Sequence, residues 1–258
     1  MVRDVRKQLP ALGTRTLFVV IKHQLEAEGL RIGRDRFFTL LRQHDLLIRP
    51  KGRHRVTTTN SNHWMKKYPN LIRALTVTRP NELWVADITY VRLEPEFRYL
   101  SLLTDAYSHK IVGYALSTGL ETEGPLVALR QALRQRRPEA DGRHQPLIHH
   151  SDRGVQYCSK AYTDLLEEQQ IQISMTEHGD PYENAIAERL NGILQYEFDL
   201  IDGFENHGQM VKQLNQAVRL YNDERPHASC DGLTPSRAHT TTGPLRKHWS
   251  KKNYKPVK

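Results

Sequence analysis

Three carboxylates of this 258-residue sequence are candidates for chemistry because of the segments in which they lie. Asp87 lies inside the apolar run VADIT, Asp152 follows directly after PLIHH, and Glu188 belongs to the stretch PYENAIAERLNGILQYEF. A carboxylate in or beside a buried strand costs several kcal/mol unless it is paired or binds a metal ion. Each also has a plain alternative when taken alone: a salt bridge for Asp87, a turn or helix N-cap for Asp152, and simple solvent exposure for Glu188.

Glu188 lies on an uncommon face of the helix that we predict over residues 181–198. One face of this helix is apolar, with Ile186, Leu190, Ile193 and Leu194. The other face repeats polar residues at helical spacing: Asn184, Glu188, Asn191 and Gln195. A carboxylate flanked by amides, without Lys or Arg on the same face, is not typical of an ordinary solvated helix.

Together the three carboxylates predict a metal site. Converging carboxylates repel one another unless cations neutralise them, and Mg²⁺ or Mn²⁺ is the natural choice for oxygen ligands. Two such ions about 4 Å apart could activate a water or a 3′-hydroxyl and stabilise the oxygen that leaves phosphorus. The chemistry predicted from these residues is in-line attack on a phosphodiester.

The elements that must position these residues form an α/β pattern. The runs WVADITYV, RYLSLLTDA and KIVGYALS predict an antiparallel meander of three strands. A helix over 122–137, the strand PLIHHSD, a helix over 159–170, the strand IQISM and helices over 181–198 and 208–222 follow. This order predicts a mixed five-stranded sheet flanked by helices. The first strand is then central and the next parallel strand lies beside it, so Asp87 and Asp152 approach at one edge while the helix of Glu188 crosses above.

A small helical unit is predicted ahead of this sheet. Residues 14–28 and 34–44 have helical periodicity and are joined by the turn GLRIG, which suggests a helix-turn-helix. A plain helical hairpin has the same pattern. If the second helix contacts DNA, its outward residues Arg34 and Arg42 are the candidates. The polar segment 49–67 is a further candidate strip for phosphates, through Lys51, Arg53, Arg55, Lys66 and Lys67.

The charge is unevenly distributed along the chain. The net charge is +9, but residues 1–80 carry 17 Lys and Arg against 5 acids, residues 81–231 carry 14 against 24, and residues 232–258 carry 7 against none. Basic ends commonly bind a polyanion, for which nucleic acid is the usual candidate, although a solvated basic surface remains the alternative. An acidic centre fits a protein whose acids hold metal ions.

Several classes of protein are excluded by composition. Two cysteines, Cys158 and Cys230, cannot form a disulfide framework, and no zinc-ligand spacing organises the 13 histidines. No run of eighteen apolar residues exists, and the N-terminus MVRDVRKQLP lacks the apolar centre of a signal peptide. We therefore expect no membrane partner and a reducing, cytoplasmic location.

Four ordered motifs resemble the bacterial insertion-sequence transposases of the OrfB type, which have a retroviral-integrase-like core. The motifs are WVADITYV, LIHHSDRGVQYCS, SMTEHGDPYENAIAERLNGILQYEF and YNDERPHASCDGLTPSRA. Residues 153 through 187 separate Asp152 from Glu188, which is the spacing used in that family, and the resemblance covers roughly residues 10–238.

The resemblance implies an RNase-H-like fold and a D-D-E triad of Asp87, Asp152 and Glu188 that binds two Mg²⁺ or Mn²⁺ ions. It implies cleavage of DNA at the terminal inverted repeats of an element, and transfer of the 3′-hydroxyl strand to target DNA without a covalent protein–DNA intermediate. A dimer or larger assembly on double-stranded DNA is expected. In this family the protein is often fused to an upstream reading frame that supplies another DNA-binding segment.

The domain boundaries follow from these patterns. We expect a helix-turn-helix-like DNA-binding region at 1–48, a basic linker at 49–80, an RNase-H-like catalytic core at 81–238 and a basic, disordered tail at 239–258. Secondary candidates for DNA contact are Arg153, Gln156, Tyr157, Asn184, Asn191, Arg225 and His227. The alternatives are a place in the core for Tyr157, an offset of local acid charge for Arg153, ordering of the glutamate for Asn184 and Asn191, and a helix-end role for Arg225 and His227.

Two further sets of residues have a structural interpretation. Asp105 could be a fourth acid near the site, but we favour a partner for Lys110. His149 and His150 precede Asp152, and because side chains alternate along a strand, at most one of them faces the site. We expect neither to bind metal.

Two other functions remain open on sequence alone. A DNA-binding regulator would use the basic ends and keep the acidic core as a scaffold, and a ribonuclease-H-type nuclease would cut RNA–DNA hybrids. The intact triad opposes the first of these, and the basic N-terminal helices oppose the second.

Overall fold

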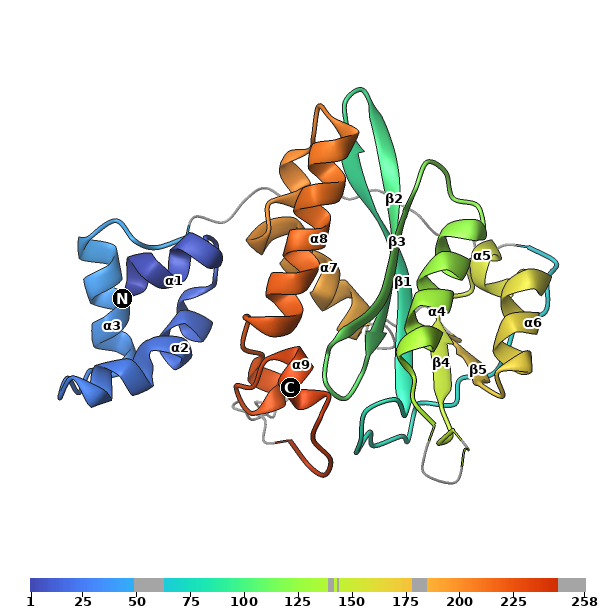
Figure 1. Cartoon of the computed structure of the whole chain (residues 1–258), viewed down its shortest axis with the longest axis horizontal. Helices are drawn as coiled ribbons and strands as arrows, with labels where there is room; N and C mark the ends of the chain where they lie inside the picture. Colours follow the sequence, from blue (N-terminus) through green and yellow to red (C-terminus); the bar gives the residue numbers. More distant parts are fainter. Residues whose placement is uncertain (49–62, 139–141, 143, 178–184, 246–258) are drawn as a thin grey trace, which may run out of the picture.

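A computed structural model of the chain describes residues 1–48, 63–138, 142, 144–177 and 185–245. Its elements form a mixed five-stranded sheet with helices on both faces and a separate group of three helices at the N-terminus (Figure 1). The mixed five-stranded sheet flanked by helices that the sequence predicts is confirmed. None of the described helices is both long and apolar enough to cross a membrane.

The sheet has the strand order β3-β2-β1-β4-β5, which places β1 at its centre. The first three strands form the predicted antiparallel meander, and β4 pairs with β1 in parallel. Their bounds are β1 Leu83–Leu93, β2 Glu96–Asp105, β3 Ile111–Ser117, β4 Ile148–Ser151 and β5 Gln172–Met175. Both faces of β1 are buried, which explains why its sequence is almost continuously apolar rather than alternating.

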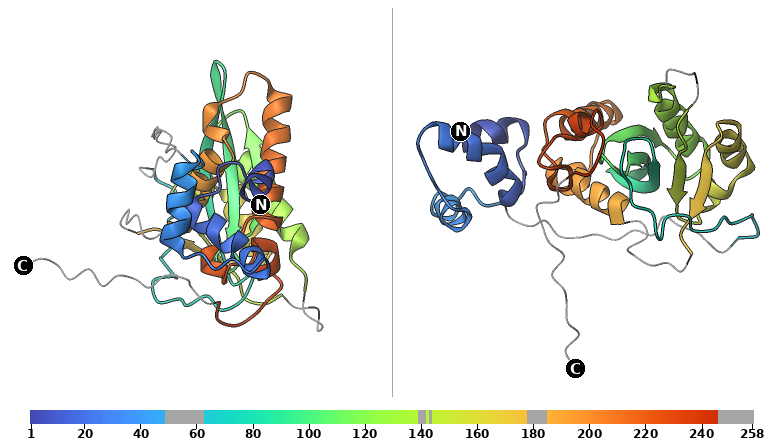
Figure 2. Two further views of the ribbon diagram at one scale, coloured as in Figure 1. Left: turned by 90° about the vertical axis from the view of Figure 1, so that its left-hand side faces the viewer. Right: turned by 90° about the horizontal axis from the view of Figure 1, so that it is seen from below.

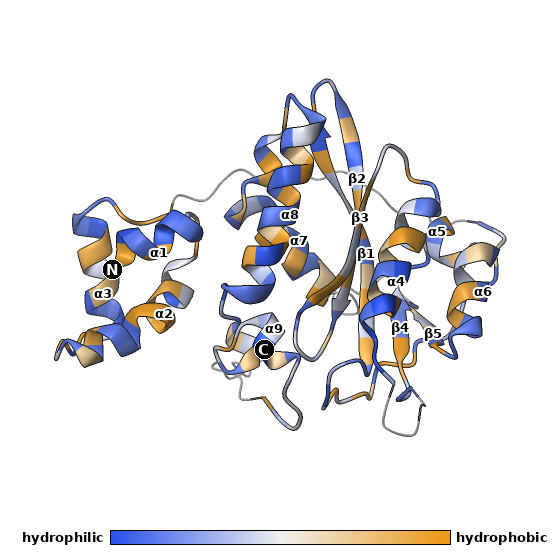
Figure 3. Cartoon of the chain, in the orientation of Figure 1, coloured by the Kyte–Doolittle hydropathy of each residue, from blue (hydrophilic) through white to orange (hydrophobic). Residues whose placement is uncertain are grey.

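Two hydrophobic clusters lie on the two faces of the sheet. On one face, α7 (Ala185–Glu197) and α8 (His207–Asp223) pack through residues such as Leu194 and Leu214 against the meander. On the other face, α4 (Glu123–Gln135) and α6 (Lys160–Glu168) pack through residues such as Leu129 and Tyr162 against Trp84. Figure 3 shows hydrophobic and hydrophilic residues alternating along these helices, as expected when each helix buries one side.

Close packing of α4 on β3 depends on Gly113. A Cβ atom at this position would collide with the backbone oxygen of Ala128 in α4. The glycine therefore allows the helix to approach the strand more closely than a side chain would permit.

The N-terminal helices are α1 (Val2–Gln8), α2 (Thr14–Ala27) and α3 (Arg34–Gln43). They pack on one another through Leu17, Ile21 and Leu41, and the rings of Phe18 and Phe37 lie 5.3 Å apart. The group lies beside the C-terminal part of the core, which contains α8 and α9 (Pro235–Ala238) (Figure 2). Helices over 14–28 and 34–44 were predicted, whereas α1 was not.

Other short elements also escaped prediction. These are α5 (Val155–Cys158), α9 and the 3₁₀ turns η1 (Leu200–Asp202) and η2 (Ala228–Cys230). The helix predicted from residue 181 is described from Ala185 onward, and the tail predicted to be disordered lies largely outside the described residues, which end at 245.

Candidate active site

The register between β1 and β4 brings Asp87 and Asp152 to neighbouring positions. Val85 is the partner of His150 in the parallel pairing, and it is the last pair in that ladder. Two residues further along each chain are Asp87 and Asp152. Side chains alternate between the two faces of a sheet along each strand. Asp87 and Asp152 therefore project from the same face of the sheet, at adjacent positions on neighbouring segments of the chain.

A tight turn holds Asp152 where β4 ends. The backbone N–H of Gly154 donates to Asp152 Oδ1 at 2.9 Å, and α5 begins at the next residue. A Cβ on Gly154 would lie only 3.0 Å from this same oxygen. The small residue therefore leaves room for the carboxylate to be held by its own loop.

Helix α7 carries Glu188 over the same edge of the sheet. One turn further along the helix, Asn191 Nδ2 donates to Asp87 Oδ2 at 2.6 Å. A second turn later, Gln195 Nε2 donates to Thr89 Oγ1 at 2.9 Å. The polar helix face noted in the sequence thus faces β1 at this edge, while Glu188 itself is exposed.

The electrostatics of the three carboxylates show that they act on one another. Burial and the negative charge of Asp152 raise the pKa of Asp87 from 3.8 to about 7, and Glu188 adds to this increase. Hydrogen bonds from the Ile88 backbone and from Asn191 oppose it. No Lys or Arg is among the described groups that shift the pKa of Asp87, and both charged groups that act on it raise this pKa.

The chemistry of this donor set fits a hard divalent cation. Carboxylate oxygens are the ligands that Mg²⁺ and Mn²⁺ prefer. Beside them, Asn191 Oδ1 is buried and has no hydrogen-bond partner among the described residues. An unpaired amide oxygen next to repelling carboxylates is the environment in which a cation is favourable.

The two histidines before Asp152 are engaged in the core. His149 Nε2 is hydrogen-bonded to the Tyr162 hydroxyl at 2.9 Å, and His150 Nδ1 is hydrogen-bonded to Ser174 Oγ at 2.8 Å. Burial lowers the pKa of His149 to about 3. These contacts favour a structural role for both rings.

Two of the three DNA-contact candidates in the loop after Asp152 are buried in the protein. Gln156 donates to the Leu120 carbonyl at 2.7 Å, and Tyr157 packs its ring against Tyr162. Both side chains are buried, which favours the core role left open for Tyr157. Arg153 is partly exposed at the same loop.

Arg225 and His227 are also buried. Arg225 forms a two-pronged ion pair with Glu197, with nitrogen–oxygen distances of 2.8 and 2.9 Å. The His227 ring stacks on His109 with centroids 4.2 Å apart. These contacts favour the helix-end role that the sequence left open beside phosphate contact.

Asp105 does not pair with Lys110 in the described structure, so that expectation is wrong. Its carboxylate accepts from the backbone N–H groups of Asn81 and Ser108 at 2.7 and 2.8 Å, and from Ser108 Oγ at 2.6 Å. Donors from Asn81 and from the turn after β2 satisfy this buried acid, and His239 Nδ1 lies 3.6 Å from its Oδ1.

A different group, His109, His227 and Cys230, brings nitrogen and sulfur atoms within 4.8 Å of one another. Two imidazole rings that stack face to face direct their lone pairs side by side rather than toward one ion. Cys230 Sγ also donates toward the Ser108 carbonyl at 3.3 Å. The cluster is accounted for by packing.

The remaining candidates for DNA contact are divided between the surface and the residues outside the description. Arg34, Arg42, Lys66 and Lys67 are exposed. Lys51, Arg53, Arg55 and Asn184 lie outside the described residues. The sequence analysis did not single out Trp64 or Arg189, two exposed residues close to candidates that it did name. For Trp64 the available signal was a tryptophan within a basic segment.

Comparisons with known proteins agree with this fold. One integrase-core-domain profile matches residues 77–181, and a second matches residues 169–235. The uncharacterized 31 kDa protein of insertion element IS600 from Shigella sonnei is 35% identical over 226 residues, which is 87% of this chain and 79% of that protein. The transposase of IS629 from the same organism is 35% identical over 78% of this chain and 66% of its own length.

Among solved structures, the intasome of simian T-cell lymphotropic virus in complex with a PP2A regulatory subunit contains a similar fold. The match has a TM-score of 0.55 and 18% identity, and it covers 100% of this chain and 79% of that one. The likeness shows an integrase-like fold. The chain belongs to the insertion-sequence transposases with an integrase-like core. Membership of this class implies DNA as the partner and the use of a divalent metal ion.

Proposed function

We propose that this transposase cleaves DNA at the ends of an insertion element and joins the 3′-hydroxyl strand to target DNA, with Asp87, Asp152 and Glu188 as its catalytic carboxylates. The observation that supports this proposal is the raised pKa of Asp87, on which burial, Asp152 and Glu188 all act at one edge of the sheet. Such an arrangement is costly unless it serves to bind metal.

The same three residues would hold the metal, as two Mg²⁺ or Mn²⁺ ions. When bound, the ions supply Lewis acidity for attack on a phosphodiester. The chain's own residues provide the geometry. Asn191 orients Asp87 by donating to one of its oxygens, and the Gly154 N–H orients Asp152. Glu188 is exposed and can reach a phosphodiester bound from solvent.

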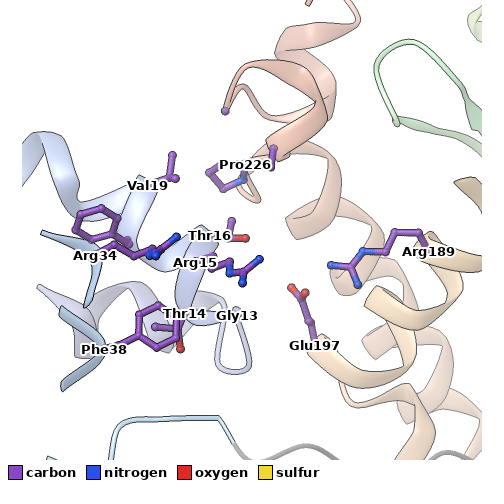
Figure 4. A pocket seen from close by; sticks show the side chains of 13 residues that line it. Gly13, Thr14, Arg15, Thr16, Val19, Arg34, Phe38, Arg189, Glu197 and Pro226 are labelled. Atoms are coloured by element: carbon purple, nitrogen blue, oxygen red, sulfur yellow. The ribbon is translucent and has the colours of Figure 1, made fainter. Parts of the chain in front are cut away.

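DNA would bind along a groove of about 1070 Å³ between the N-terminal helices and the core. Figure 4 shows Arg15 and Arg34 lining one side, with Arg189 of α7 and Glu197 on the other. Glu197 is already neutralised by its ion pair with Arg225. The three groove arginines therefore leave net positive charge for backbone phosphates.

A neighbouring hollow extends this groove along α3. It shares Arg15, Arg34 and Phe38 with the first hollow and reaches Arg42. The first turn of α2 also lines the groove. Its N-cap residue is Gly13, which has no side chain to accept from the first backbone N–H groups of the helix. These N–H groups add positive potential to the groove. This continuity supports the assignment of residues 1–48 to DNA binding.

The assembly follows from the reaction. Strand transfer requires two element ends held together, so we infer a dimer or larger assembly on double-stranded DNA. The remaining predicted contacts, Lys66, Lys67, Arg153 and the residues outside the description, would extend the phosphate-binding surface. We also infer association with the nucleoid, and assistance by a protein from an upstream reading frame.

The test is a cleavage and strand-transfer assay on labelled element-end DNA, run with Mg²⁺, with Mn²⁺ and with EDTA. Wild-type protein is expected to give metal-dependent products that Glu188→Gln abolishes, with binding of the same DNA unchanged. Glu123→Gln on α4 is the matched control, because this exposed glutamate lies on the opposite face of the sheet and should leave the products unaltered. Full activity of Glu188→Gln would reject the proposal.

A further inference from the structure

Trp64 is the most exposed large apolar side chain of the described residues. It is 92% exposed, whereas the next, Leu30, is 48% exposed. An indole ring in water is unfavourable, and tryptophan is enriched at binding surfaces. Within the described part of the chain, the exposure of Trp64 leaves it little packing role.

The segment around Trp64 is nevertheless fixed to the catalytic core. His63 donates through Nε2 to the backbone carbonyl of Arg153, at 2.7 Å, and Arg153 follows Asp152 directly. Further along, the Leu71 N–H donates to Ser174 Oγ at 2.9 Å and the Asn70 N–H to Glu177 at 3.0 Å. The segment that carries Trp64 is therefore held next to the loop that carries one of the three carboxylates.

Positive charge surrounds this position. Lys66 and Lys67 are exposed, and the ammonium group of Lys66 lies 4.6 Å from the centroid of the Tyr68 ring. Lys67 and Arg153 both lower the pKa of Cys158 in α5, against the larger raising effects of burial and Asp152. Both cations therefore lie near this thiol, which belongs to the short helix that follows the Asp152 loop.

We propose that Trp64 stacks on an unpaired nucleobase of the DNA strand that is bound at the carboxylate site. An aromatic face beside cations that contact phosphates is the combination with which proteins hold single-stranded nucleic acid, and stacking accepts any base. Bases inside a duplex have no free face, so the base must lie beyond the paired region, next to the reacting phosphodiester. This inference rests on the proposed DNA chemistry.

A second copy of the chain or another protein could also cover an exposed tryptophan. The surrounding Lys66, Lys67 and Arg153 favour a polyanion, because a protein interface core is depleted of lysine. The DNA occupant also explains why the ring is placed beside Asp152 rather than elsewhere on the surface. The experiment below distinguishes these occupants.

The experiment compares two labelled duplexes of one sequence, one blunt and one with a three-nucleotide 3′ overhang, by fluorescence anisotropy in EDTA. Wild-type protein should bind the overhang duplex more tightly. Trp64→Ala should weaken binding of the overhang duplex about 10-fold and leave the blunt duplex unchanged, whereas Trp64→Phe should retain part of the preference. Phe97→Ala, which removes another exposed ring from the β2 end of the sheet, is the control and should change neither.

Tryptophan fluorescence gives a second readout. The overhang duplex should quench wild-type emission, and the quenching should disappear in Trp64→Phe, which retains Trp84 and Trp249. Equal binding of both duplexes by wild type and Trp64→Ala would overturn the inference. An equal loss of affinity for both duplexes in Trp64→Ala would also overturn it. So would a difference in solution mass between DNA-free Trp64→Ala and DNA-free wild type, which would indicate a protein interface.

The outcome is separable from that of the proposed function. If Glu188→Gln abolishes metal-dependent cleavage while Trp64→Ala binds normally, stacking is rejected and the transposase mechanism stands. If Trp64→Ala loses the overhang preference while Glu188→Gln remains fully active, stacking stands and the catalytic assignment is rejected.

Discussion

Asp87 is the residue at which the requirements of the fold and of the site conflict. It lies in the central strand, where the sheet supplies apolar neighbours on both sides, yet two other acids act on it. Its hydrogen bonds from Ile88 and Asn191 reduce the conflict without removing it, because the pKa remains near 7. A divalent cation would remove the remaining electrostatic cost of an ionised Asp87. The metal-free protein should therefore be less stable wherever Asp87 is ionised.

The raised pKa of Asp87 predicts that the free energy of unfolding depends on pH. The pKa of Asp87 is raised on folding from 3.8 to about 7, so its contribution is fully favourable below pH 4 and is lost as the pH rises through 7. In EDTA at pH 8, Asp87→Asn should therefore have a free energy of unfolding higher than that of wild type by about 1–3 kcal/mol. Urea unfolding at pH 8 and pH 4 measures this difference, which should close at pH 4.

Addition of Mg²⁺ is the control for this measurement. It should stabilise wild type at pH 8 more than Asp87→Asn, because only wild type keeps all three carboxylates. A wild-type protein whose stability relative to Asp87→Asn is the same at both pH values would contradict the raised pKa.

At the scale of elements, α7 is attached to β1 by two polar contacts spaced four residues apart on the helix and two on the strand. Asn191 binds Asp87, and Gln195 binds Thr89. These contacts fix the rotation of α7 about its axis and therefore the position of Glu188. We expect Gln195 to act as a positioning residue, which contacts neither metal nor DNA in this arrangement.

A double-mutant cycle tests the contact between Gln195 and Thr89. Thr89→Val leaves the amide without its partner and Gln195→Leu leaves a buried hydroxyl without its donor, so each single change should cost about 1–3 kcal/mol of unfolding free energy. The double variant should cost less than the two together, by about 1 kcal/mol. Strict additivity in urea unfolding would show that the pair does not attach the helix.

The ion pair between Arg225 and Glu197 attaches the end of α7 to the segment that leads into η2. The Arg225 side chain is 4% exposed and that of Glu197 is 16% exposed, so loss of the arginine leaves a carboxylate largely buried without its partner. Arg225→Met should lower the free energy of unfolding by about 3–5 kcal/mol, and combining it with Glu197→Met should restore most of the loss. If thermal unfolding shows the single variant to be as stable as wild type, the pair is not structural.

The sequence predicted the long elements and the convergence of the acids, because strand and helix periodicity and the strand order are local or topological properties. It could not assign Arg225 or Gln156 to the interior, since their partners, Glu197 and Leu120, lie 28 and 36 residues away. Nor could it supply the pairing of Val85 with His150, which fixes the two aspartates as neighbours. Short helices such as α5 were missed because four residues are too few to show a period.

At the scale of the whole molecule, DNA affinity is expected to depend on charge from two separate parts of the chain. The groove combines Arg15 and Arg34 of the N-terminal helices with Arg189 of the core. Neither part presents all three arginines, so the proposed DNA path requires both.

Charge reversal measures this cooperation. Arg15→Glu combined with Arg189→Glu should weaken binding of a 40-base-pair duplex and reduce the slope of log Kd against log salt concentration by about two. Arg134→Glu, at an exposed position of α4 on the other face of the sheet, should leave the slope within error of wild type. An unchanged slope in the double variant would exclude the groove as the path of the DNA.

Three consecutive residues of α7 lie in three different environments. Glu188 is directed to the carboxylate site, Arg189 lines the groove, and Leu190 is buried in the core. Successive residues of a helix are rotated by about 100°, so inserting or deleting one residue ahead of them would reassign all three positions at once. A substitution on α7 alters one of these surroundings at a time, whereas a change of length alters all three, and divergence of this helix is therefore expected to proceed by replacement alone.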